Sequence, residues 1–80
     1  MSRARDVVEV VAKALAATPD AVEVTESDRR GQVVVELTMA PGELGRVIGR
    51  NGRTADAVRA LAAAAGDLDG QRVAVDFRDE

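Results

Sequence analysis

Apolar residues recur every three or four positions over the first part of the chain, a spacing typical of one face of a helix. These positions are Val7, Val8, Val11, Ala12 and Leu15. Glu9 and Lys13 lie four residues apart and form an exposed pair on the other face. Pro19 disfavours the helical conformation at the residue before it, so the helix ends near "ATPD". The pattern predicts an amphipathic helix over residues 6–17.

An alternation of inward apolar residues with mostly polar ones, Val34 excepted, follows in "AVEVTESDRRGQVVVELTM". The alternation is interrupted at "SDRRG", so it predicts two strands joined as a hairpin. Arg29 and Arg30 at the hairpin tip are interpreted as solvated turn residues, with contact to an anionic partner as the alternative.

Three shorter patterns complete the chain. Residues 44–48 carry three apolar side chains on one helical face, and residues 54–65 repeat such a face over a longer helix. Gly66 is predicted to end this helix as a C-terminal glycine. The closing "RVAVDF" alternates again and predicts a third strand, with Phe77 in the core. The expected inward residues of the longer helix are Ala55, Val58, Leu61, Ala62 and Ala65.

The predicted order is helix, strand, strand, short helix, helix, strand. Three strands with one apolar face need a single covering layer, and three amphipathic helices supply it. We therefore expect an α+β fold of two layers, a three-stranded sheet covered on one face by three helices. With no internal repeat and no long linker, residues 1–80 are predicted to form one domain with an ordered core over about residues 6–77.

The composition excludes several kinds of chemistry. The chain has no Cys and no His, which removes disulfides, thiolate or imidazole metal ligands and the usual nucleophile-base pairs. An enzyme is therefore the least favoured class of function, and no cofactor, metal site or small-molecule substrate is expected. Charged residues interrupt every apolar run of membrane-spanning length near the N-terminus, so we expect a soluble, cytoplasmic protein without membrane contact.

Charge is distributed unevenly along a chain whose formal net charge is −3. Residues 44–61 contain four arginines and only one acidic residue, Asp56, whereas the rest of the chain is strongly acidic. An acidic body thus carries one basic segment, which is suited to an anionic partner.

The same segment contains closely spaced glycines. Their spacing does not fit the dinucleotide-binding fingerprint, and the lysine of a P-loop is missing. What remains is a G-x-x-G loop, residues 49–52, between two predicted helices. Glycine lets a sugar-phosphate backbone approach closely, and the start of the following helix favours phosphate. An apolar groove lined by Val47, Ile48 and Val58 is expected to hold the bases.

The stretch "VIGRNGR" resembles the signature loop of KH domains, which clamp about four nucleotides of single-stranded nucleic acid. The element order is similar to the type II, prokaryotic form of that fold. Over about residues 6–77 the chain resembles the KhpA family of small bacterial RNA-binding proteins with a single KH domain. "VVVELTMAPGELGRVIGRNGRTADAVRALAAAA" and the closing "RVAVDF" carry this wider resemblance.

The resemblance implies single-stranded RNA as the partner, and a homodimer or a heterodimer with a KhpB-type KH protein. It also implies an RNA chaperone or post-transcriptional regulator linked to cell division and envelope growth. The predicted RNA-binding residues are Arg46, Ile48, Gly49, Arg50, Asn51, Gly52, Arg53 and Thr54.

These residues are given different roles. Arg50 and Arg53 are the main phosphate contacts, and Asn51 is a hydrogen-bonding residue. Arg46 faces either the nucleic acid or solvent, and Thr54 is expected to cap the helix, with RNA contact as the alternative. Arg59 is interpreted as a surface residue.

Two features count against strong RNA binding. Asp56 lies in the first turn of the helix after the loop, where it repels phosphate, and the rest of the chain is acidic. With two or three phosphates neutralised, the log-log salt slope is expected to be on the order of −1.5 to −2. The alternative function is therefore a protein-interaction or dimerisation subunit with weak or vestigial RNA binding.

Overall fold

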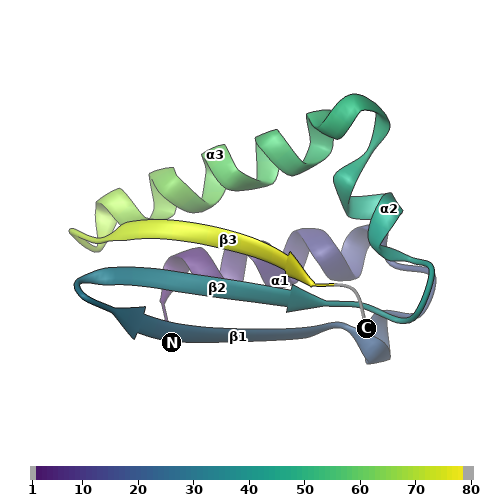
Figure 1. The fold of residues 1–80 in the computed structure, drawn as a ribbon, viewed down its shortest axis with the longest axis horizontal. Coiled ribbons are helices and arrows are strands. Elements are labelled where there is room, and N and C mark those ends of the chain that lie inside the picture. Colours follow the sequence, from purple (N-terminus) through teal and green to yellow (C-terminus); the bar gives the residue numbers. More distant parts are fainter. Residues whose placement is uncertain (1, 79–80) are drawn as a thin grey trace.

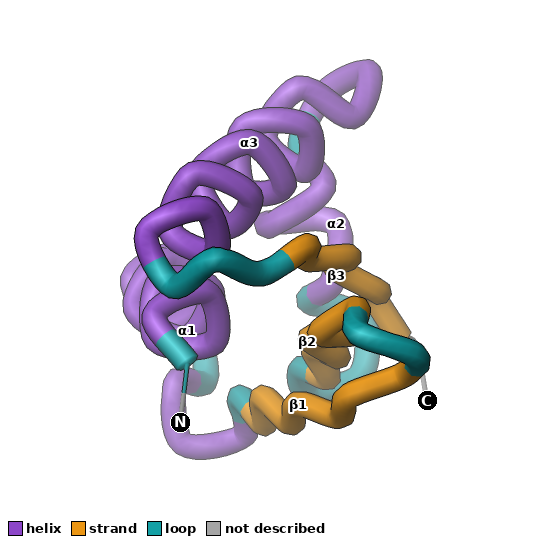
Figure 2. Tube along the Cα trace, turned by 90° about the vertical axis from the view of Figure 1, so that its left-hand side faces the viewer, coloured by secondary structure: helices purple, strands orange, loops and turns teal. Residues whose placement is uncertain are grey.

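A computed structural model describes residues 2–78 of the chain. Its main elements are α1 (Arg3–Leu15), β1 (Glu23–Arg29), β2 (Gln32–Thr38), α2 (Leu44–Ile48), α3 (Arg53–Leu68) and β3 (Arg72–Arg78). Two short 3₁₀ turns, η1 (Pro19–Ala21) and η2 (Arg50–Gly52), precede β1 and α3. The predicted order and the two-layer α+β architecture are confirmed (Figure 1). Figure 2 shows the helices together on one side of the sheet.

The three strands form one mixed sheet in the order β1-β2-β3. β1 and β2 are antiparallel, and their register pairs Arg29 with Gln32, so Arg30 and Gly31 alone form the hairpin turn. β2 and β3 are parallel, with Gln32 opposite Arg72. A parallel pair requires a long crossover, and the α2-α3 segment provides it. The GxxG loop lies within this crossover.

Small apolar side chains fill the space between the layers. Val33, Val35 and Leu37 of β2 are buried and face the helices, while their neighbours along the strand face away. α1 and α3 pack against each other and contribute mainly alanine and valine. No polar or charged residue among residues 2–78 is buried, so the side chains of the core interact by hydrophobic packing.

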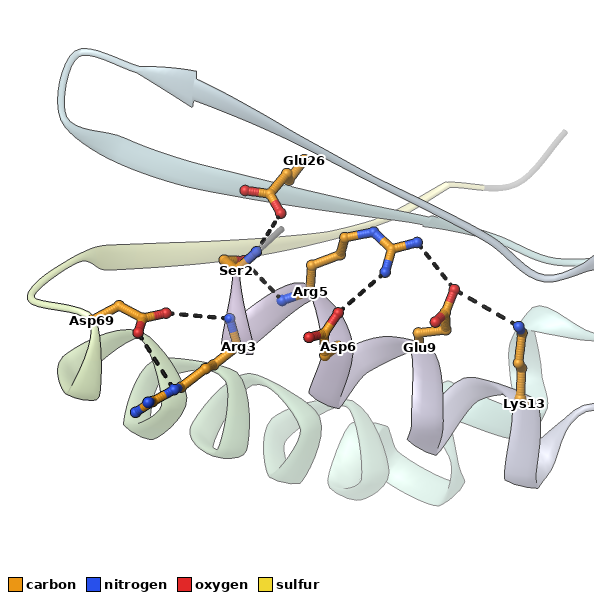
Figure 3. Close-up of polar contacts among 8 residues, drawn as sticks. All are labelled: Ser2, Arg3, Arg5, Asp6, Glu9, Lys13, Glu26 and Asp69. Carbon is orange, nitrogen blue, oxygen red and sulfur yellow. Dashed lines mark hydrogen bonds and ion pairs between the residues drawn. The ribbon is translucent and has the colours of Figure 1, made fainter.

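The first helix begins earlier than predicted. It starts at Arg3 because the Ser2 hydroxyl accepts a hydrogen bond from the Arg5 amide and caps the helix. The start is also tied to distant elements, since the Ser2 amide donates to Glu26 of β1 and the Arg3 amide donates to Asp69 (Figure 3). The helix ends at Leu15, which is exposed, before the predicted boundary at residue 17.

The prediction for the end of the third helix is wrong. Gly66 is buried inside α3, which continues to Leu68, and Gly70 with φ 68° follows the helix. A Cβ at Gly66 would collide with the side chain of Val73 and lie 3.0 Å from the Gln71 carbonyl oxygen. Glycine at position 66 therefore allows close packing against the strand that follows. Leu61 was also predicted to face inward, but it is exposed, because the buried face of α3 runs through Val58, Ala62 and Ala65.

None of the helices within residues 2–78 is long and apolar enough to cross a membrane.

Candidate nucleic-acid interface

The GxxG loop reverses the chain between α2 and α3 (Figure 1). Gly49 has φ 73° and ψ 177°, while Asn51 and Gly52 have φ 57° and 73° with ψ near the left-handed helical region. The Gly52 amide donates to the Gly49 carbonyl at 3.2 Å, and the Arg53 amide donates to the Arg50 carbonyl. Of these three positive-φ positions, the only side chain belongs to Asn, which tolerates this conformation better than most residues.

The two glycines of the loop are required for different reasons. A Cβ at Gly49 would collide with the Thr54 hydroxyl and lie 2.9 Å from the Thr54 Cβ. A Cβ at Gly52 would meet nothing within 4 Å. Gly49 is therefore fixed by both packing and conformation, whereas Gly52 is fixed by conformation and leaves its surroundings open to another molecule.

Thr54 does not cap α3, contrary to the prediction. It lies inside the first turn, and its side chain packs toward Gly49. Gly52 occupies the capping position and has no side chain to accept a hydrogen bond. The start of this 16-residue helix therefore has no side-chain cap. Its first amide, that of Arg53, is used within the loop, but its positive dipole end can still attract an anion.

Arg46, Arg50 and Arg53 are exposed around the loop. Within residues 2–78, none of the three takes part in an ion pair. Arg3, Arg5, Lys13 and Arg78, in contrast, are all paired with carboxylates (Figure 3 shows the first three). The basic charge beside the loop is thus left free for an external anion.

Arg59 is used differently from the arginines of the loop. Its guanidinium carbon lies 4.8 Å from the centroid of the Phe77 ring, and its Nη1 is 3.9 Å from Asp56 Oδ1. The sequence interpretation of Arg59 as an ordinary surface residue missed this stacking contact between α3 and β3. The spacing of Asp56 and Arg59 predicts their pairing, but only the fold brings Phe77 beside them.

The predicted apolar groove is wrong for two of its three residues. The exposed fraction is 0% for Val47 and 2% for Val58, because both side chains point into the core. Only Ile48 is partly exposed, and it precedes Gly49 directly. The apolar surface beside the loop therefore includes Ile48, while Val47 and Val58 pack in the core beneath α2 and α3.

Glu43 holds the start of α2 against the segment that follows α1. Its carboxylate accepts hydrogen bonds from the Thr18 hydroxyl at 2.7 Å and from the Ala17 and Thr18 amides at 3.0 Å each. The Thr18 hydrogen bonds, with that from Ala17 and the nearby charge of Arg46, lower the pKa of Glu43 below its usual value. This contact fixes the entry to the short helix that leads into the loop.

Residues 2–78 contain no cluster of three or more acidic side chains that could hold a metal ion.

A three-stranded mixed sheet covered by helices, with a GxxG loop joining two of them, defines a KH domain. Residues 5–77 match the family described as "KhpA/KhpB, KH domain", and the chain belongs to this family. The predicted family is confirmed. Because the family is non-catalytic, the prediction that the chain is not an enzyme is confirmed as well.

Curated relatives match over nearly their whole length. The "RNA-binding protein KhpA" of Aquifex aeolicus is 45% identical over 77 residues, which cover 96% of this chain and 98% of the relative. The protein of the same name from Leifsonia xyli is 48% identical over 71 residues, which cover 88% of this chain and 90% of the relative. The protein of the same name from Streptomyces coelicolor is 40% identical over 74 residues, which cover 92% of this chain and 90% of the relative. No solved structure matches the chain.

Proposed function

We propose that this chain is a noncatalytic KH protein that binds single-stranded RNA through its GxxG loop. One observation carries the proposal: Arg46, Arg50 and Arg53 surround a loop of positive-φ glycines and have no ion-pair partner within residues 2–78. The relatives named RNA-binding proteins support RNA as the nucleic acid.

In the proposed complex, the RNA backbone lies against Gly52, where no protein atom would obstruct it. Arg50 and Arg53 pair with successive phosphates, and Arg46 extends the charged surface by one helical turn. Asn51 donates or accepts a hydrogen bond at the loop tip, and Ile48 provides an apolar contact for a base. Thr54 acts indirectly, because it packs against Gly49 and so fixes the shape of the loop.

Binding through this loop is expected to be weak. Only two or three phosphates are neutralised, and Asp56 lies one turn from Arg53. Asp56 is partly compensated by Arg59, which lies 3.9 Å away. For single-stranded nucleic acid, each phosphate contact contributes about −0.7 to the slope of log affinity against log salt concentration. Two or three contacts therefore give a slope on the order of −1.5 to −2.

The family supports a wider role in the cell. We propose that the protein is a single KH domain that acts in the cytoplasm as an RNA chaperone or post-transcriptional regulator linked to cell division and envelope growth. Weak binding by one loop favours action as a homodimer or with a KhpB-type partner, because two linked sites raise the overall avidity.

The proposal is tested by crosslinking the protein to cellular RNA. Exchange of Arg50 and Asn51 for Asp is expected to abolish crosslinking while unfolding and self-association stay as in the wild type. Lys13→Asp/Thr25→Asp is the control, because it changes the charge equally at exposed positions on α1 and β1, outside the loop. Crosslinking that persists in the loop variant would contradict the assignment of the RNA site.

A second candidate function is favoured by the exposed apolar residues of the helical layer. Val10, Leu61 and Leu68 of α1 and α3 are 68%, 52% and 73% exposed. These helices lie side by side (Figure 2), so their outer surface suits a protein-interaction or dimerisation subunit. This function predicts that Leu61→Asp reduces self-association in sedimentation equilibrium and that wild-type protein does not crosslink to RNA. Wild-type crosslinking that depends on Arg50 and Asn51 would exclude it as the main function.

A further inference from the structure

A second group of arginines lies at the hairpin end of the sheet, away from the GxxG loop. Arg29 ends β1 and Arg72 begins β3, and both are paired in register with Gln32 of β2. Directly paired residues share one face of a sheet. Because Val33 next to Gln32 is buried toward the helices, this row lies on the open face. Arg30 in the adjoining turn adds a third exposed guanidinium.

These three arginines are also free of ion pairs within the described part of the chain. Two nearby carboxylates are engaged elsewhere. Asp28 Oδ1 accepts a hydrogen bond from the Gly31 amide at 3.1 Å, and Asp69 holds the backbone and side chain of Arg3. The guanidinium groups of the hairpin end are therefore free to pair with an external anion, although Asp28 and Asp67 keep their negative charges nearby.

The backbone of Arg30 gives no structural reason for an arginine. Its φ is 56° and that of Gly31 is 82°, as in a two-residue hairpin turn that favours Asn-Gly. A side chain with a Cβ is disfavoured in this left-handed conformation, and least so for Asn. The turn itself would be served better by Asn than by the arginine present at position 30.

A shallow, open hollow adjoins Arg72, the arginine that begins β3. Its volume is about 370 Å³, and it is lined by Gln32, Ala63, Asp67, Gln71, Arg72 and Val73. The amides of Gln32 and Gln71 and the carboxylate of Asp67 offer both donors and acceptors. Unpaired RNA bases are recognised by hydrogen bonds of this kind along their edges.

The hollow lies at the opposite end of α3 from the GxxG loop. The loop precedes Arg53, whereas Ala63 and Asp67 belong to the last turns of the helix. A helix of 16 residues is about 24 Å long. Figure 1 shows the β1-β2 turn and α2 at opposite ends of the molecule. An RNA that is long enough to cover only the GxxG loop therefore does not reach the hairpin, whereas a longer RNA can contact both.

We propose that the hairpin end is a second contact site for the same single-stranded RNA. Arg29, Arg30 and Arg72 bind phosphates beyond those held by the GxxG loop, and the hollow accepts an unpaired base. This inference rests on the proposed RNA binding. It requires that affinity and salt dependence increase with RNA length.

The test compares oligouridylates of 5 and 15 nucleotides by fluorescence anisotropy. The hairpin variant is Arg30→Asn/Arg72→Gln, in which Asn suits the turn. The control is Lys13→Gln/Arg78→Gln, which removes the same charge, and Arg78 ends the strand that Arg72 begins. For the 15-mer near 0.1 M salt, the hairpin variant is expected to lose about tenfold in affinity and about 1.4 in salt slope. Its affinity for the 5-mer should stay unchanged.

Loss of 15-mer affinity no larger than in the control would overturn the inference. The loop variant Arg50→Gln/Arg53→Gln separates this failure from that of the proposed function. If only the hairpin inference fails, the loop variant still weakens both oligomers. If the loop assignment fails, the loop variant binds both oligomers like the wild type, and the hairpin variant alone reduces binding of the 15-mer. A wild type that binds neither oligomer would overturn both.

Discussion

Thr54 and Gly49 pack so closely that a Cβ at position 49 would collide with the Thr54 hydroxyl. This contact joins the end of α2 to the first turn of α3 and fixes the shape of the loop between them. It also explains why the two loop glycines are not equivalent, since nothing lies within 4 Å of a Cβ built at Gly52.

Gly49→Ala is therefore expected to destabilise the fold far more than Gly52→Ala. Position 49 combines a φ and ψ that only glycine adopts readily with a steric clash, for a cost of about 3 kcal/mol. Position 52 carries the conformational cost alone, about 1 kcal/mol, and less for Asn. Urea unfolding of the variants measures the difference. Equal losses at the two positions would show that Thr54 does not constrain Gly49.

Gly66→Ala should destabilise the protein although it lies inside a helix. Alanine is usually better than glycine there by about 1 kcal/mol. Here, however, the added methyl meets Val73 and the Gln71 carbonyl, and overpacking costs about 1–3 kcal/mol. Gly45→Ala in α2 is the matched control, because its Cβ would meet nothing within 4 Å. A Gly66→Ala variant more stable than the wild type in thermal unfolding would contradict the packing described.

The Arg59 and Phe77 side chains should be energetically coupled. A guanidinium over an aromatic face at an exposed site contributes about 0.5–1 kcal/mol. A double-mutant cycle with Arg59→Gln and Phe77→Leu is expected to return a coupling of that size. Asp56→Asn should change stability little, because both partners of that ion pair are largely exposed. Additive effects of the first two substitutions would mean that the ring and the guanidinium do not interact.

Glu43 should make the fold sensitive to acid. Because the pKa of its carboxyl is lowered in the folded state by the Thr18 and Ala17 hydrogen bonds, its contribution is present above the unfolded pKa of about 4.3. That contribution is lost as the pH falls through the lower, folded pKa. Glu43→Gln should thus lower the melting temperature at pH 7, and the difference from wild type should shrink at pH 3. A difference in melting temperature that is the same at both pH values would argue against the contact with Thr18. Asp20→Asn is the control, because it removes an exposed carboxyl.

Local patterns were enough to predict the elements and their order. The alternation around "SDRRG" and the helical spacing before and after the GxxG loop lead directly to the two layers. The failures came where tertiary packing overrides a local rule. Gly66 has the local signature of a helix end, yet it lies within α3, where its missing side chain makes room for Val73.

For the candidate site, local patterns likewise predict some features and not others. Glycine spacing and arginine content located the loop, but whether Val47 and Val58 face the groove or the core depends on how α2 and α3 sit on the sheet. The stacking of Arg59 on Phe77 depends on the fold that brings β3 against α3, across 18 positions of sequence. No local pattern carries that information.

The salt dependence of binding tests most directly whether the arginines of the GxxG loop bind RNA phosphates. Wild-type protein and a five-nucleotide RNA should give a log-log slope on the order of −1.5 to −2. Arg50→Gln/Arg53→Gln should lower the magnitude of that slope by about 1.4 and the affinity about tenfold near 0.1 M salt, while Lys13→Gln/Arg78→Gln leaves both unchanged. A loop variant that keeps the wild-type slope and affinity would contradict the account.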